Sequence, residues 1–291
     1  MTDAKNINLF LMDGNPTGRI KCSLANWTGL AYKIPRAMLD KAKDIDALNQ
    51  TGVYLLFGTL VETDEPLVYV GQAGIRKNGQ GILRRWEEHN KSEDKEWWNE
   101  AVALTTRDDY FGPTEISYLE NKLRNMALEA KRYKVMNSNE PTAGNITEEK
   151  QSELDDFIES ARLVIGALGY KLLEPIVKKP ENPHSQKQLI DDEPILFFQR
   201  QGADARGQIT SEGFAVLSGS RISTTIHQSA RQGTRNLRRK YRHLINADGV
   251  LTQDLLFTSP SAAASFVGGG TLSGNATWKT NEGIFLGQLL I

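Results

Sequence analysis

The chain has 291 residues, a net charge of −1, 39% hydrophobic residues and 24% charged residues. These values are typical of a globular protein with one or two domains, and they exclude a polycationic chain or one that is disordered throughout. The single cysteine, Cys22, excludes an intramolecular disulfide, and with only four histidines it argues against a thiolate zinc site. Any metal is therefore expected to be a hard cation held by oxygen ligands.

No stretch of the sequence predicts contact with a membrane. No apolar run approaches the roughly 20 residues that span a bilayer, and the N-terminus lacks the basic and then apolar order of a signal peptide. A single cysteine also fits a reducing compartment. We therefore expect a cytoplasmic protein.

Residues 1–50 predict an N-terminal extension that packs on the domain after it. Residues 7–12 form a strand-like run that ends at a turn with glycine and proline, and residues 19–24 alternate as a returning partner strand. Pro35 then begins an expected helix over residues 36–48. This part of the sequence carries no pattern that indicates a catalytic site.

Residues 51–141 predict a small α+β domain. Its expected elements are strands over 53–60, 67–70 and 101–105 and helices over 82–90 and 114–133. The first two strands are joined by a short polar turn, which is typical of an antiparallel hairpin. The order β-β-α-β-α therefore predicts a three-stranded antiparallel sheet flanked by helices.

The remaining sequence predicts a helical extension, a linker and a second α+β domain. An amphipathic helix is expected within residues 142–175, and the linker, residues 176–194, contains Pro180, Pro183 and Pro194 and directly follows Pro175. Residues 195–291 then predict short strands, a basic helix over 232–246 and a helix of small residues that begins near Ser259.

A local positive charge marks this second domain. No acid occurs between residues 213 and 247, where seven cations stand: Arg221, Arg231, Arg235, Arg238, Arg239, Lys240 and Arg242. A basic surface within a neutral protein indicates binding to a polyanion. A solvated helix face that pairs with acids elsewhere in the fold explains the charges equally well.

Four sequence features, in chain order, resemble the GIY-YIG nuclease domain: Gly52-Val53-Tyr54, Tyr69-Val70-Gly71, Arg85-Trp86-Glu87-Glu88-His89 and Glu120. Valine replaces isoleucine in both tripeptides, a change that keeps the strand character. The resemblance covers about residues 51–141, under a third of the chain. Residues 236–290 are similar to a C-terminal domain of unknown function that recurs behind GIY-YIG modules, through residues 255–264 and Trp278-Lys279.

The resemblance implies a role for each matched residue. Tyr54 and Tyr69 would be the paired active-site tyrosines, Arg85 the catalytic arginine and His89 the histidine that follows it on the helix. Glu120 would bind the metal, Mg²⁺ or Mn²⁺, and Asn137 would be the late asparagine of the site. Two positions have rivals, Arg84 for Arg85 and Asn139 for Asn137.

The chemistry expected from these residues is phosphodiester hydrolysis. Glu120 can serve as the only protein ligand of Mg²⁺, which retains several waters, and Arg85 can donate charge-assisted hydrogen bonds to the phosphate. Tyr54 would act as general base or orient the attacking water, with Tyr69 completing its hydrogen bonds. As ordinary structural residues, the same side chains would be strand tyrosines, a helix-end histidine and a solvated glutamate.

The sequence thus predicts a Mg²⁺-dependent DNA endonuclease. The residues expected to bind nucleic acid are Arg84, Arg235, Arg238, Arg239, Lys240 and Arg242. Two alternatives are a nucleic-acid-binding protein whose nuclease site is idle and a domain at 195–291 that binds a protein partner. The form of the DNA (duplex, single-stranded or branched), RNA as a substrate, the pathway and the oligomeric state stay open.

Overall fold

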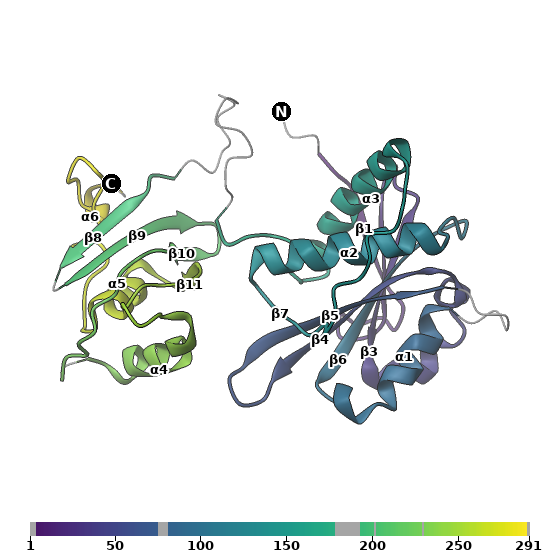
Figure 1. Ribbon diagram of the computed structural model, residues 1–291, viewed down its shortest axis with the longest axis horizontal. Coiled ribbons are helices and arrows are strands. Elements are labelled where there is room, and N and C mark those ends of the chain that lie inside the picture. Colours follow the sequence, from purple (N-terminus) through teal and green to yellow (C-terminus); the bar gives the residue numbers. More distant parts are fainter. Residues whose placement is uncertain (1–3, 75–80, 178–192, 201, 229, 290–291) are drawn as a thin grey trace. The chain divides into compact units, whose positions relative to one another are not determined.

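The computed structural model describes residues 4–74, 81–177, 193–200, 202–228 and 230–289. The chain is mixed α+β, as predicted, and divides into an N-terminal unit, Met1–Glu174, and a C-terminal unit, Pro175–Ile291 (Figure 1). Most of the predicted linker, residues 176–194, lies outside the described residues. No helix in the described part of the chain is long and apolar enough to cross a membrane.

The N-terminal unit is built on a seven-stranded sheet in the order β1-β2-β3-β6-β4-β5-β7. Its strands are β1 Ile7–Leu11, β2 Ile20–Leu24, β3 Gly29–Pro35, β4 Gly52–Leu60, β5 Glu65–Ala73, β6 Trp98–Thr106 and β7 Lys134–Val135. All neighbours are antiparallel except β5 and β7.

Two predictions for this unit are wrong. The sheet has more than three strands because β3 pairs with β6 along its whole length, from Gly29 opposite Thr106 to Pro35 opposite Glu100. The expected helix over 36–48 is instead two 3₁₀ helices, η1 Arg36–Ala42 and η2 Asp46–Asn49, since the apolar residues of this short segment fold back onto the sheet.

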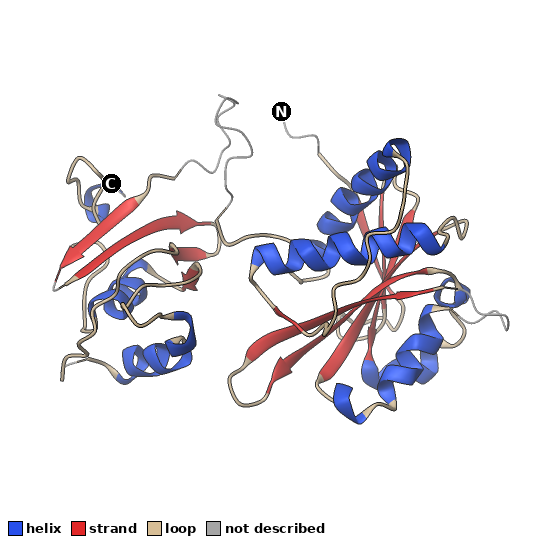
Figure 2. Ribbon diagram, viewed as in Figure 1, coloured by secondary structure: helices blue, strands red, loops and turns tan. Residues whose placement is uncertain are grey.

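Helices cover both faces of this sheet (Figure 2). On one face, α2 Pro113–Ala130 packs on β4 and β5, and α3 Glu148–Ala167 packs on β2 and β3; Val53, Leu55 and Phe57 of β4 belong to the same core. On the other face, α1 Ile82–Asn90 packs with Tyr54 and Leu56. Because both faces are buried, β4 is an almost continuous apolar run rather than an alternating one.

The glycines at residues 52 and 71 create room for tight packing. Gly71 lies opposite Tyr54 in the β4–β5 pairing, and a Cβ at Gly71 would lie 2.4 Å from both Cζ and Oη of Tyr54. A Cβ at Gly52 would lie 2.5 Å from the Leu104 carbonyl oxygen and 2.7 Å from Cδ1 of Ile82 on α1. The Tyr54 ring therefore crosses β5 only where the side chain is a hydrogen atom.

The C-terminal unit has a four-stranded antiparallel sheet in the order β11-β10-β9-β8. Its elements are β8 Leu196–Arg200, β9 Ala203–Thr210, β10 Gly213–Val216, α4 Gln232–Lys240, β11 Leu255–Phe257, α5 Pro260–Gly268 and α6 Leu286–Leu289. The small residues of α5 let it pack on the sheet beside Phe198, Phe214 and the fully buried Trp278. The basic helix is shorter than predicted, because a separate 3₁₀ turn, η4 Arg242–Leu244, follows it.

We predict that Gly71→Ala destabilises the N-terminal unit, because the added methyl group overlaps the Tyr54 ring and a packed sheet has little room to yield. Overpacking of this kind costs about 1–3 kcal/mol. The measurement is the free energy of unfolding by urea, followed by tryptophan fluorescence.

Gly74→Ala is the matched control, because the nearest atom to its added Cβ is Ile116 Cδ1 at 3.9 Å. We expect this control to change the free energy of unfolding by less than about 0.5 kcal/mol. Equal unfolding curves for the two variants would contradict the packing role of Gly71.

Candidate active site

Three aromatic rings meet where α1 packs on β4 and β5. The Tyr54 hydroxyl oxygen lies 2.7 Å from Nε2 of His89, and both side chains are buried. The Tyr69 ring completes the group, with centroids 6.3 Å from the Tyr54 ring and 5.4 Å from the His89 ring. We call Tyr54, Tyr69 and His89 the tyrosine–histidine cluster.

Burial sets the protonation states in this cluster. Burial, with smaller effects from the Lys95 and Arg85 cations, lowers the pKa of His89 to about 4. Burial and the neighbouring Tyr69 raise the pKa of Tyr54 above its usual range. At neutral pH a neutral imidazole therefore faces a protonated phenol. In the tautomer that carries its proton on Nδ1, Nε2 of His89 accepts a hydrogen bond from the Tyr54 hydroxyl.

The two neighbouring arginines of α1 have different surroundings. Arg85 donates to Glu88 (2.8 Å) and also interacts with Tyr54; these partners outweigh the effect of burial and raise the pKa of Arg85. Arg84 instead pairs with Glu87 at 3.2 Å and with Glu88 at 3.7 Å. Of these two rivals, the structure brings Arg85 to the cluster.

Glu120 approaches the cluster from α2, on the other face of the sheet. Its carboxyl group is buried, and burial raises its pKa, while a hydrogen bond from Gln72 and the charge of Arg85 act in the opposite direction. Ser117 Oγ donates to Gln72 Oε1 at 3.3 Å, which orients the Gln72 amide. Glu120 also raises the pKa of Tyr69, so its charge reaches the cluster.

Asn137 holds the edge of β5 beside the cluster. Its amide donates to the Val70 carbonyl (2.7 Å) and accepts from the Val70 N–H (3.0 Å), as a neighbouring strand would. β7 pairs only with Leu67 and Val68, so this side chain continues the edge pairing towards Gly71. Asn139 is exposed. Asn137 therefore positions the strand that carries Tyr69.

Sequence reasoning gave no role to Lys95, which lies beside the cluster. Its Nζ lies 3.5 Å from the centroid of the Tyr69 ring, and burial together with Arg85 lowers its pKa to about 8. Lys95 ends a 3₁₀ turn, η3 Glu93–Lys95, that follows α1. No helical or strand spacing relates residue 95 to the motif residues, so the sequence pattern offers no signal for it.

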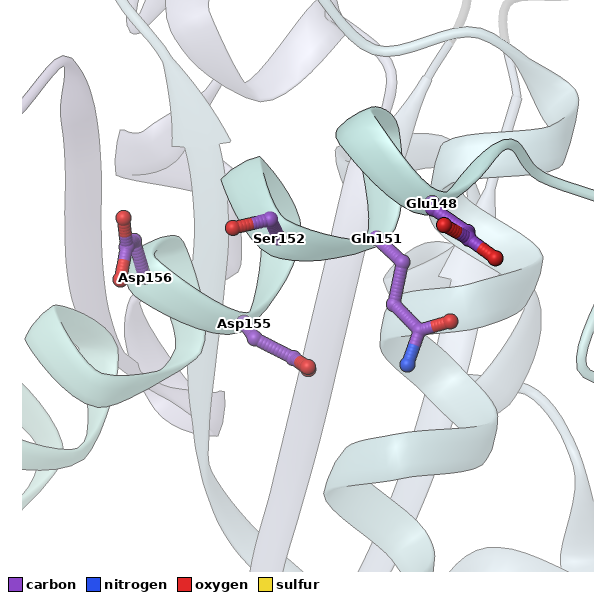
Figure 3. Close-up of a pocket in the computed structure, with 5 residues that line it drawn as sticks. All are labelled: Glu148, Gln151, Ser152, Asp155 and Asp156. Atoms are coloured by element: carbon purple, nitrogen blue, oxygen red, sulfur yellow. The ribbon is translucent and has the colours of Figure 1, made fainter.

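An open pocket on α3 is lined by Glu148, Gln151, Ser152, Asp155 and Asp156 (Figure 3). All five residues belong to one helix, and none belongs to the tyrosine–histidine cluster. Asp155 already accepts a hydrogen bond from the Tyr118 hydroxyl (2.7 Å) and pairs with Lys122 at 3.5 Å. Asp155 therefore has partners within the fold, and we interpret the other side chains of this pocket as the solvated face of α3.

The predicted nucleic-acid residues of α4 and η4 fall into two groups. Arg235 donates to the His227 and Gln228 carbonyls, both at 3.0 Å. Arg238 donates to the Phe266 (2.6 Å) and Val267 (3.1 Å) carbonyls at the C-terminal end of α5, and burial lowers its pKa to about 10. The second group, Arg239, Lys240 and Arg242, is exposed.

Comparison with known proteins identifies the C-terminal part of the chain. Residues 196–290 match a family described as a domain of unknown function, DUF4357. This confirms the C-terminal domain of unknown function that the sequence predicts. No curated protein and no solved structure matches the chain.

We predict that His89 makes stability depend on pH. A histidine in the unfolded chain has a pKa of about 6.5, whereas that of His89 in the folded protein is about 4. The unfolded chain therefore binds more protons between these values, so stability is complete above about pH 6.5 and falls as the pH drops towards 4. The loss attributable to His89 is about 3 kcal/mol at most.

The measurement is the urea-unfolding free energy at pH 7 and at pH 4.5. We expect His89→Gln to be less stable than wild type at pH 7 but to lose less stability on acidification. His243→Gln, which removes an exposed histidine, is the control. An unchanged pH dependence in His89→Gln would contradict the prediction.

Proposed function

We propose that residues 51–141 carry a Mg²⁺-dependent endonuclease site of the GIY-YIG type that hydrolyses phosphodiester bonds of DNA. One observation carries this proposal. Residues far apart in the sequence converge from four elements: Tyr54 from β4, Tyr69 from β5, Arg85 and His89 from α1, and Glu120 from α2. These are the residue types that a phosphodiesterase site requires: a carboxylate for the metal, an arginine for the phosphate, and hydroxyl and imidazole groups for the water.

The donor set fits a hard divalent cation. Glu120 would hold Mg²⁺ or Mn²⁺ through a carboxylate that Gln72 orients, and a cation there would offset the cost of burying this charge. When bound, Mg²⁺ supplies Lewis-acid neutralisation of charge on the phosphoryl oxygens.

Arg85 is suited to bind the phosphodiester group itself. Its guanidinium lies between Glu88 and Tyr54, so its position is fixed before a substrate arrives. The fork of N–H groups can donate two hydrogen bonds to one phosphate, and the guanidinium stays charged at any working pH.

Tyr54 and His89 can together remove a proton from water. The raised pKa of Tyr54 makes a free phenolate rare at neutral pH. The hydroxyl can nevertheless accept a proton from water as it passes its own proton to His89 Nε2, 2.7 Å away. Burial lowers the pKa of His89 to about 4, so at neutral pH Nε2 has a free lone pair but is a weak base. A phosphodiester anion bound beside it would raise this pKa and so favour the proton transfer. Tyr69 can then complete the hydrogen bonds of the attacking water.

The exposed cations of the C-terminal unit support binding of a polyanion. Arg239, Lys240 and Arg242 are exposed, unlike Arg238, and the stretch around them contains no acid. Lysine and arginine side chains of this kind contact phosphates without regard to base sequence. The same observation favours a second candidate function, nucleic-acid binding without cleavage.

Divalent-dependent cleavage tests the proposal. Supercoiled plasmid, single-stranded DNA and single-stranded RNA are incubated with the full chain in Mg²⁺ or in EDTA. We expect DNA cleavage in Mg²⁺ only, and a loss of at least about 100-fold in Glu120→Gln because the metal ligand is removed. Glu129→Gln, an exposed position of the same helix, is the matched control.

Three outcomes separate the candidates. Equal cleavage by Glu120→Gln and wild type would contradict the role of Glu120. Salt-sensitive binding without cleavage, under every divalent ion tried, would favour the second candidate. Weaker binding by Arg239→Gln/Lys240→Gln than by wild type, in the same measurement, would assign the polyanion contact to α4.

A further inference from the structure

Lys95 brings a second positive charge to the tyrosine–histidine cluster. Its half-buried ammonium lies over the Tyr69 ring and acts electrostatically on His89. In the part of the chain that the structure describes, no carboxylate forms an ion pair with Lys95. Arg85 lies near enough to disfavour the Lys95 charge further. Arg85 already pairs with Glu88 at 2.8 Å, so Lys95 is the cation of the two that a bound anion would stabilise most.

The fold holds Lys95 in this position through Arg36. The Arg36 guanidinium donates to the backbone carbonyls of Lys95 (3.4 Å), Glu96 (2.8 Å) and Trp98 (3.2 Å). It also donates to the Asn90 side chain (2.7 Å) and carbonyl (3.2 Å) at the end of α1, and it lies 4.9 Å from the Trp98 ring. One side chain of η1 therefore fixes the whole turn that follows α1.

We propose that Lys95 is a second phosphate-binding residue of this site, which acts with Arg85 on the phosphodiester group of a nucleic acid. This proposal takes its substrate class, nucleic acid, from the proposed function. Its physical basis is the preorganised, half-buried cation beside Tyr69. Burial and Arg85 keep its pKa near 8, so the ammonium is the main form at neutral pH and a bound phosphate would stabilise it further.

A purely structural role is the competing explanation. A lysine over a tyrosine ring is stabilised by the cation–π interaction, and its stem covers apolar surface. Such a role predicts a change in stability when Lys95 is replaced, but no change in how salt weakens nucleic-acid binding. The salt dependence counts the phosphate contacts directly.

The test measures binding of a fluorescent single-stranded oligonucleotide to the full chain from 50 to 300 mM KCl, without divalent ions and in the Glu120→Gln background. We expect Lys95→Met to weaken binding about fivefold to tenfold at low salt. The slope of log affinity against log salt should fall by about 0.7, the value for one phosphate contact on a single strand. Lys95→Arg should restore both values.

Lys150→Met is the matched control. Lys150 also lies over a tyrosine, 4.5 Å from the Tyr110 ring centroid, but it pairs with Glu153 on α3, across the sheet from the cluster. We expect it to leave the slope unchanged.

The outcomes for Lys95 and for the nuclease proposal are separable. An unchanged slope in Lys95→Met overturns the Lys95 proposal even if the wild type cleaves DNA. A failure of the Glu120→Gln protein itself to bind the oligonucleotide overturns it too. A reduced slope, rescued by arginine, supports Lys95 even if the wild type never cleaves, which would overturn only the proposed function.

Discussion

The contact between Tyr54 and His89 depends on the close packing of the Tyr54 ring, from β4, against Gly71 of β5. Because Gly71 has no Cβ, the Tyr54 ring can cross β5 and place its hydroxyl 2.7 Å from His89 on α1. The same packing buries both polar groups, and burial keeps the imidazole neutral and the phenol protonated. Packing at one glycine thus determines the protonation states on which the proposed proton transfer relies.

The charges around this contact come from both faces of the sheet. Arg85 and Lys95 follow from α1 and its next turn, whereas Glu120 comes from α2. Arg36 fixes the turn that carries Lys95, and Asn137 fixes β5, the strand that carries Tyr69. Preorganised groups of this kind stabilise charge that develops during a reaction without further rearrangement. In the C-terminal unit, Arg238 caps α5 in a similar structural role.

Local patterns predicted the elements that carry the motif residues. β4, β5, α1 and α2 lie where their apolar and turn residues place them, and the motif residues converge. β3 was missed because its pairing with β6 joins segments about 70 residues apart, which no local pattern records. Lys95 and the half-buried Arg238 were also beyond prediction, since their roles depend on tertiary contacts with Tyr69 and with the carbonyls of α5.

The most direct measurement of the central claim is the single-turnover rate of DNA cleavage in Mg²⁺ by Tyr54→Phe. This change keeps the ring that packs on Gly71 and removes only the hydroxyl that faces His89. Tyr32→Phe, another buried tyrosine of the same sheet, serves as the control. If Tyr54 transfers the proton, the cleavage rate of Tyr54→Phe is lower than that of the wild type by about 100-fold or more. Its unfolding curve stays close to that of the wild type. A rate equal to that of the wild type would contradict the account.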